Sequence, residues 1–310
     1  MFEDYLELYM GYLQNINRSD TTKRQYKKEL LSFFAFIETK NIQDVEKIKT
    51  IHIDLYQNKL LEKGNKSASR AKKISVLKSF FHFLHSRDYI EKNPTAALEP
   101  IKIKDADRKK RDTLTVKEAE KFIEKIEKNS IPSLKLRNKL IAVIFVLGGL
   151  RVSELCNLKV EDVSLKEKTI FVRNGKGGKD REVPIFNETV ADIKEYLRSR
   201  PHESEYFFTK KHNGEPLVPR TVHALIKDHV GKAKIDKNIG CHSLRRTSAT
   251  IQLLSGNNIR YIQENLGHSN IGTTMLYIQV DKETRKDEIR NNNLLSKRLK
   301  KKKEKEKKDE

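Results

Sequence analysis

The sequence predicts a mainly α-helical protein that carries one small β-hairpin or sheet and divides into two domains. Apolar residues recur at helical spacing through most of the 310 residues. Residues 169–173 and 181–186 instead contain alternating or β-branched residues on either side of a glycine-rich turn. Residues 99–112 form a charged stretch with no hydrophobic period, which indicates a linker. We therefore expect a helical domain over residues 1–98 and a mixed α/β domain over residues 113–296.

The first domain is predicted to be a bundle of four or five helices. Two of its segments carry apolar residues on one helical face, namely Tyr26, Leu30, Phe33, Phe34 and Ile37, and then Ile74, Leu77, Phe80, Phe81 and Leu84. Lys72, Lys73 and Lys78 lie elsewhere on the second of these helices. The bundle is therefore expected to have a basic side.

Helix starts are indicated by capping signals in both domains. Thr22 with Gln25, and Thr115 with Glu118, have the spacing of a capping box. Ser67 is a candidate cap for the helix that follows the Gly-Asn pair at positions 64 and 65. These positions predict where three of the helices begin.

The second domain is predicted to place its hairpin between helical regions. An amphipathic helix with Phe122, Ile123 and Ile126 is followed by an apolar helix over residues 138–148, which ends at Gly148-Gly149. Beyond the hairpin, residues from about 187 to 280 are again expected to be helical. Residues 297–310 are a Lys/Glu run in which Leu299 is the single apolar residue, which is typical of a disordered basic tail.

The net charge of +21 favours a polyanionic partner. Residues 297–310 hold nine Lys or Arg against four Asp or Glu, so most of the excess lies outside this tail. A lysine-rich solvated surface is the alternative explanation. Cys156 and Cys241 show no paired spacing, the N-terminus lacks a signal-peptide pattern, and the apolar run 140–150 is too short to span a bilayer. We expect a cytoplasmic, nucleoid-associated protein.

Four short segments contain candidate functional residues, and each also has a structural explanation. An arginine at a helix start, such as Arg151 in Gly-Leu-Arg-Val-Ser-Glu-Leu, is commonly a surface ion pair. Lys176 in Gly-Lys-Gly-Gly lies where a hairpin tip would lie. His268 in Leu-Gly-His has the position of a helix cap, and Tyr277, nine residues later, is one of ten tyrosines that would ordinarily be core. The fourth segment is His-Ser-Leu-Arg-Arg-Thr from His242.

Several other chemistries are excluded by spacing. The 175–179 turn does not have the glycine spacing of a Walker A loop, the histidines show no His-Glu-x-x-His pattern, and no partners stand at zinc spacing from Cys241 and His242. No carboxylate cluster suggests a two-metal nuclease, so we expect neither a metal nor a cofactor. Two arginines, a lysine, two histidines and a tyrosine remain. This cationic set suits phosphoryl transfer, in which guanidinium groups stabilise the charge and a nearby base activates the phenol.

In their order along the chain, these segments resemble the tyrosine recombinase (phage integrase) family, and specifically its small Xer-like members. The family pattern is filled by Arg151, Lys176, His242, Arg245, His268 and Tyr277. The resemblance covers about residues 113–285. It implies a catalytic domain there, a helical core-binding (SAM-like) domain over residues 1–98, and a C-shaped clamp on DNA.

The resemblance also implies a role for each residue. Arg151 and Arg245 would clamp the scissile phosphate, and Lys176 would protonate the leaving 5′-oxygen. His242 would act as the general base for Tyr277, which would form a 3′-phosphotyrosine link. His242 and Arg245 are three residues apart, so on a helix they share a face and could meet one phosphate.

The remaining residues of these motifs have weaker implications. His268 would donate a hydrogen bond to a non-bridging oxygen, while Glu154 is expected to support the site. The family commonly has a histidine directly after the second arginine, where this chain has Arg246. Since Arg246 points in a different helical direction from Arg245, we expect it to face DNA or solvent.

The implied reaction needs neither metal nor ATP, because the phosphotyrosine conserves the energy of the broken diester. Strand exchange would require two duplexes with a specific site and, by family analogy, a homotetramer. Residues 281–297 could dock on a neighbouring protomer or form an ordinary terminal helix. The function most favoured is Xer-type resolution of chromosome or plasmid dimers. A mobile-element integrase is the near alternative, and a type IB topoisomerase or a non-catalytic DNA-binding protein is more distant.

Overall fold

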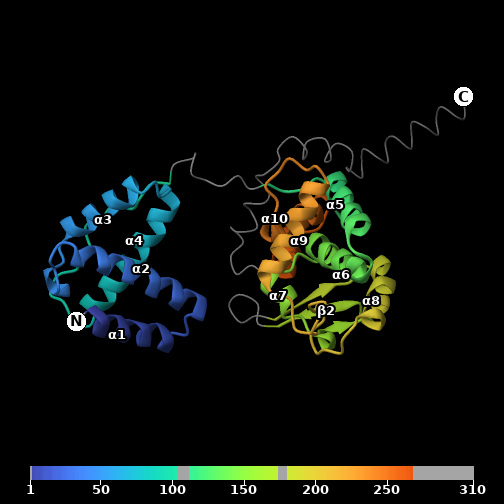
Figure 1. Cartoon of the computed structure of the whole chain (residues 1–310), viewed down its shortest axis with the longest axis horizontal. Helices are drawn as coiled ribbons and strands as arrows, with labels where there is room; N and C mark the ends of the chain where they lie inside the picture. The colour runs from blue at the N-terminus through green and yellow to red at the C-terminus, as the bar shows by residue number, and fades with distance from the viewer. Residues whose placement is uncertain (1, 104–111, 174–179, 268–310) are drawn as a thin grey trace, which may run out of the picture. The chain divides into compact units, whose positions relative to one another are not determined.

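The computed structural model describes residues 2–103, 112–173 and 180–267. The chain divides into two compact units, Met1–Lys109 and Lys110–Glu310. Figure 1 shows that the described part of both units consists mainly of helices and that the strands belong to the second unit. The predicted fold class, mainly α with a small sheet, is confirmed.

The first unit is a helical bundle, as the apolar periodicity predicts. Its described residues form α1 (Phe2–Asn15), α2 (Asp20–Glu38), α3 (Thr50–Glu62) and α4 (Ser67–His85), with a 3₁₀ turn at Val45–Lys47. All the apolar residues predicted to line α2 and α4 are buried except Tyr26, which is half-buried. Aromatic rings fill the centre, where Tyr9 meets Phe80 edge-on at 5.3 Å and Phe33 meets Phe81 edge-on at 6.1 Å.

Two of the three predicted caps of the helices are wrong. Helix α2 begins two residues before Thr22, because the Ser19 hydroxyl accepts a hydrogen bond from the Thr22 amide and so caps the helix itself. Ser67 is the first residue of α4 and is buried, and no side-chain hydrogen bond caps that helix. The capping box of Thr115 and Glu118 is confirmed at the start of α5 (Val116–Asn129).

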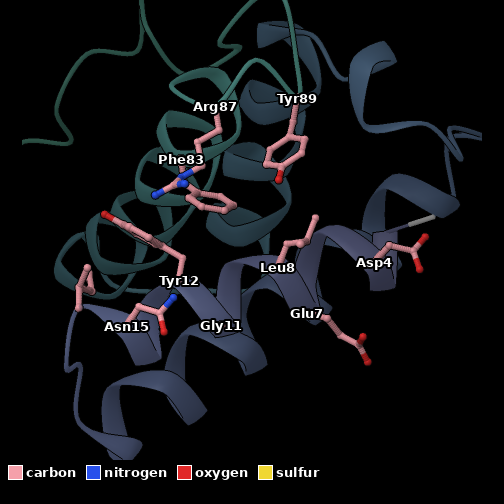
Figure 2. Close-up of a pocket in the computed structure, with 10 residues that line it drawn as sticks. Asp4, Glu7, Leu8, Gly11, Tyr12, Asn15, Phe83, Arg87 and Tyr89 are labelled. Carbon is pink, nitrogen blue, oxygen red and sulfur yellow. The ribbon is translucent and has the colours of Figure 1, made fainter.

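A pocket of about 750 Å³ opens between α1 and the C-terminal end of α4 in the first unit (Figure 2). The Arg87 guanidinium lies over the rings of Tyr12 and Phe83, at 5.5 and 5.4 Å from their centroids. Asp4 and Glu7 also line the pocket.

The core of the second unit is built from helices that precede the sheet in the sequence and from helices that follow it. After α5 come α6 (Pro132–Val143), a π-helical turn (Ile144–Gly148), α7 (Val152–Cys156), α8 (Asn187–Ser199), α9 (Pro219–Lys232), α10 (Cys241–Leu254) and α11 (Ile259–Leu266). The apolar helix predicted over 138–148 therefore starts earlier, and its last turn is π-helical. None of the helices in the described ranges is long and apolar enough to cross a membrane.

The continuous helical region predicted from residue 187 onward is wrong for residues 200–218. This segment forms isolated antiparallel pairs, Lys159 with Tyr206 and Thr209 with Pro216. The physical reason lies in its breakers, since Pro201 and Pro216 cannot sit inside a helix and Gly214 adopts a positive φ of 67°. Residues 268–280 of the predicted region lie outside the described residues.

The predicted hairpin is confirmed, with one additional short strand. The sheet is antiparallel in the order β1 (Val163–Ser164), β2 (Thr169–Val172) and β3 (Arg181–Pro184). Ile170 pairs with Val183, and both are buried. Strand β3 packs against α11. The turn over residues 174–179, which includes Lys176, lies outside the described residues.

Candidate active site

Three of the six predicted site residues lie in the described part of the second unit. They are Arg151, His242 and Arg245, whereas Lys176, His268 and Tyr277 lie outside it. The structure brings Arg151 and Arg245 together, although they are far apart in the sequence. A carboxylate, Glu154, and a third arginine, Arg181, join them.

A left-handed glycine places Arg151 at the start of α7. Gly149 ends the π-helical turn with φ 63°. A Cβ at this position would lie 2.5 Å from Leu266 Cδ2 and 3.0 Å from Ser248 Oγ, so only glycine fits without rearrangement. Arg151 then becomes the N-cap residue of α7, and its backbone amide donates to Glu154 Oε2 at 2.7 Å.

Glu154 is a buried carboxylate shared by three guanidinium groups. Its side chain is 6 % exposed. Arg181 donates to both of its oxygens, at 3.0 and 2.7 Å, Arg151 Nη1 donates to Oε1, and Arg245 Nη1 lies 3.7 Å from Oε2. Burial alone would raise the pKa of Glu154, but the hydrogen bonds and charge of Arg181, together with hydrogen bonds from Arg151, lower this pKa to about 2. The carboxylate is therefore ionised at neutral pH. Glu154 was expected to support the site rather than to react, and it here holds the guanidinium groups of Arg151 and Arg181.

The same three arginines bind the last carbonyl groups of α11. Arg181 Nε donates to the Asn265 carbonyl at 2.7 Å, Arg245 Nη2 donates to that of Leu266, and Arg151 Nη2 donates to that of Gly267 at 2.9 Å. Carbonyl groups at a helix C-terminus lack partners within the helix and carry the negative end of its dipole. The cations therefore fix the end of α11, directly before the position of His268.

Helix α10 presents its two predicted site residues differently. The His242 side chain is exposed, whereas Arg245 is 2 % exposed and donates to the Gly149 carbonyl at 2.7 Å. Ser248, on the same helix, donates to the Leu147 carbonyl at 3.0 Å and so ties α10 to the π-helical turn. The turn that positions Arg151 is thus held by the helix that carries Arg245.

The sequence analysis predicted that Arg246 faces DNA or solvent, but the structure shows its side chain bound to other residues of the protein. It is half-buried, and its guanidinium donates to the Asp112 carbonyl at 3.1 Å and to Ser243 Oγ at 3.0 Å. The Asp112 carboxylate in turn accepts from the Asn238 amide at 2.9 Å. Arg246 and the Asn238 backbone amide therefore hold Asp112, at the start of the second unit, beside α10.

Arg181 is the residue of this cluster that the motif analysis missed. It belongs to no motif, since it stands in the strand after the glycine-rich turn. A signal was nevertheless present, because Arg181 and Val183 lie two residues apart and so share one face of β3. Val183 is fully buried and the Arg181 side chain is 7 % exposed. An arginine on the inward face of a strand needs a buried anionic partner.

The described residues gather no group of three or more His, Cys, Asp or Glu side chains that could hold a metal ion. The cluster has three guanidinium groups and one carboxylate, and so carries an excess of positive charge. Such a site can bind a phosphate and stabilise further negative charge on it.

Comparison with known families agrees with this chemistry. Residues 112–284 match the model of the phage integrase family, and residues 6–88 match that of the phage integrase N-terminal SAM-like domain. The chain belongs to the phage integrase family. Relatives that match most of the chain at about 35% identity are tyrosine recombinases named XerA or XerC, so its function is Xer-like site-specific recombination by an enzyme that cleaves and rejoins DNA.

Relatives and solved structures of this family span nearly the whole chain. The tyrosine recombinase XerA of Pyrococcus furiosus is 35% identical over 294 residues, which cover 94% of this chain and 95% of that protein. A crystal structure of XerA recombinase, 28% identical, covers 94% of this chain and 98% of its own with a TM-score of 0.53. XerH bound to a palindromic difH substrate is 23% identical, covers 92% and 83%, and shares the fold with a TM-score of 0.73.

Proposed function

We propose that this recombinase breaks and rejoins DNA strands at a short specific duplex site through a 3′-phosphotyrosine link to Tyr277. The observation that carries the proposal is the convergence of Arg151 and Arg245 on Glu154. Two guanidinium groups held side by side concentrate positive charge where the non-bridging oxygens of one phosphate can be bound. This arrangement supplies the charge stabilisation that attack on a phosphodiester requires.

The other predicted residues supply proton transfer and the nucleophile. A tyrosine hydroxyl has an ordinary pKa of about 10, so Tyr277 needs a base, and we assign that role to His242. Lys176 protonates the leaving 5′-oxygen, and His268 donates a hydrogen bond to a non-bridging oxygen. His268 follows directly after the α11 carbonyl groups that the arginines bind, which supports its place beside the same phosphate.

The bond energy of the diester is conserved in the phosphotyrosine, so a 5′-hydroxyl can reverse the step without ATP or a metal ion. When the hydroxyl comes from a second duplex, strands are exchanged. Two duplexes and four protomers are therefore the assembly we propose. Residues 281–297, which lie outside the described residues, are our candidate for the contact between protomers.

DNA binding by both domains is part of the proposal, with residues 1–98 as the core-binding domain, 99–112 as the linker and 113–296 as the catalytic domain. In the first unit a groove of about 560 Å³ is lined by Lys72, Lys73, Asn65, Ser69 and other residues, among them Glu29, whose carboxylate pairs with Lys73. Cationic and hydrogen-bonding side chains of this kind suit a phosphate backbone. The XerH and lambda integrase structures that share this fold were solved bound to DNA sites.

The proposed biological role is resolution of chromosome or plasmid dimers. It is supported by the Xer names of relatives that match over most of their length. Such a role would place the protein at the nucleoid. This role is tested by selecting DNA fragments from the source genome with the purified protein. We expect the protein to select one near-palindromic site on the chromosome. Selection of the ends of a mobile element would contradict the proposed role. The mass of the complex assembled on two duplexes tests the stoichiometry of four.

The chemistry is tested with a nicked duplex from which the cleaved strand cannot be religated. Wild-type protein should accumulate a covalent protein–DNA adduct. Tyr277→Phe should bind the same duplex with similar affinity and form no adduct. Adduct formation by the phenylalanine variant would show that Tyr277 is not the nucleophile.

A further inference from the structure

We infer that Arg181 is a positioning residue for the phosphate-binding arginines. It takes up the charge of Glu154, so that less of the positive charge of Arg151 and Arg245 is cancelled by this carboxylate. The inference rests on the proposed function of Arg151 and Arg245. Arg181 stands at the start of β3, and its side chain is almost as buried as that of Glu154. We do not expect it to touch the scissile phosphate.

The first line of evidence is the geometry of the Arg181–Glu154 pair. Nη1 and Nη2 of Arg181 donate to the two oxygens of Glu154, at 3.0 and 2.7 Å, in the bidentate arrangement. Arg151 shares one of these oxygens through a single guanidinium nitrogen, and Arg245 is more distant at 3.7 Å. Arg181 therefore holds both carboxylate oxygens with its guanidinium group, whereas the guanidinium of Arg151 holds one and the second oxygen accepts from the Arg151 backbone amide. A lysine could carry the charge but could not form this fork.

The second line of evidence is the balance of charge. Three guanidinium groups surround one carboxylate, so the cluster retains the positive charge of two arginines. Without Arg181, the carboxylate would be compensated by Arg151 and Arg245 alone, and half of their charge would be cancelled. A phosphodiester gains negative charge as it is attacked, so this loss would be felt most in the transition state.

The third line of evidence is the link to α11. Arg181 Nε donates to the Asn265 carbonyl, and the next two carbonyl groups accept from Arg245 and Arg151. A Cβ on Gly267 would lie 3.2 Å from Arg181 Cδ and Nη1, so the Leu-Gly-His motif needs its glycine partly to make room for Arg181. Strand β3, α11 and the arginine pair are thereby held as one hydrogen-bonded group.

The test compares Arg181→Met and Arg181→Lys with wild type on the nicked duplex. DNA affinity and the single-turnover rate of adduct formation are measured separately. We expect the affinity to change little and the rate to fall about 10–100-fold in Arg181→Met, which is the range known for groups that orient metal ligands. Arg181→Lys should be intermediate. Arg198→Met, which removes an exposed arginine paired with Glu195 on α8, is the matched control and should cleave at the wild-type rate.

A double variant separates positioning from a merely structural role. Arg181→Met with Glu154→Gln removes both charges of the pair and restores the net charge of two arginines. It should therefore form adduct faster than Arg181→Met alone. If it is slower than the single variant, or if Arg181→Met and Arg181→Lys both cleave at the wild-type rate, the inference is wrong. If Arg181→Met does not fold, the rates of Arg181→Lys and of Arg181→Lys with Glu154→Gln decide instead. A wild-type rate for Arg181→Lys overturns the inference. A reduced rate for Arg181→Lys that does not recover when Glu154→Gln is added overturns the proposal that Arg181 acts by compensating the charge of Glu154.

The proposed function fails in a different way from this inference. If wild-type protein forms no adduct, or Tyr277→Phe still forms one, the nucleophile assignment is wrong. If both behave as expected and the Arg181 variants cleave normally, only the role of Arg181 is rejected.

Discussion

Replacement of Glu154 by glutamine should destabilise the second unit strongly at neutral pH. Burial opposes ionisation, but Arg181 and Arg151 lower the pKa of Glu154 from 4.5 to about 2. This shift corresponds to about 3 kcal/mol of stability at pH 7. Glutamine would also leave buried guanidinium groups without their carboxylate, and removing one partner of a buried pair costs about 3–5 kcal/mol. We expect a loss of this size.

The loss should depend on pH in a defined direction. Because the pKa of Glu154 is lower in the folded protein, its stabilisation is fully present above the unfolded pKa of 4.5 and is lost as the pH falls towards 2. By about pH 3.5, about 1 kcal/mol of the wild-type advantage over Glu154→Gln should be gone. Urea unfolding followed by circular dichroism, at several pH values between neutral and about 3.5, measures the difference in free energy of unfolding of the second unit between wild type and Glu154→Gln.

Glu124→Gln is the matched control for this experiment. Glu124 is an exposed glutamate that pairs with Lys128 one turn later on α5. Its replacement should not measurably change the free energy of unfolding, since exposed pairs contribute little. A gap between wild type and Glu154→Gln that stays constant from pH 7 to pH 3.5 would refute the view that Glu154 is held ionised by the arginines.

Three further outcomes are expected. Gly149→Ala should lower the free energy of unfolding by about 2–4 kcal/mol and slow adduct formation, because Gly149 has a positive φ and an added Cβ would contact Leu266. Gly231→Ala in α9, where an added Cβ meets open space, should be neutral or stabilising in the same urea unfolding and cleavage assays. Burial raises the pKa of Cys156 to about 11 and that of Cys241 to about 12, so a thiol reagent at pH 8 should label the folded protein slowly and the unfolded protein rapidly; fast labelling of the native state would show that these thiols are accessible. The logarithm of the binding constant for duplex DNA should fall linearly with the logarithm of salt concentration, and an affinity independent of salt would contradict binding through phosphates.

Much of the fold follows from short-range rules that can be applied to the sequence directly. The apolar faces of α2 and α4 and the capping box of α5 depend on residues a few positions apart, and the β2–β3 hairpin joins two neighbouring segments of the chain. The order of the six motif residues also belongs to the sequence alone. It identifies the family without any coordinates, as the match over residues 112–284 confirms.

The sequence rules fail where a local alternative competes. At the start of α2, Ser19 and Thr22 both suit a cap, and only the backbone path decides that the Ser19 hydroxyl accepts the hydrogen bond. Between α8 and α9, the proline and glycine positions outweigh the helical pattern of the surrounding chain. These errors concern element boundaries, where several weak preferences of similar size meet.

The tertiary structure alone decided how charge is organised at the site. Arg181 meets Glu154 across 27 residues and Asn265 across 84, and no periodicity relates such positions. These partners become neighbours only when β3 packs on α11 and the Gly149 turn places Glu154 of α7 beside Arg245 of α10. The sequence by itself determined which residue types are present, in what order and on which kinds of element. The folded chain determined that one buried carboxylate holds three arginines, because ion pairing depends on distance in space and on the loss of solvent around the charges.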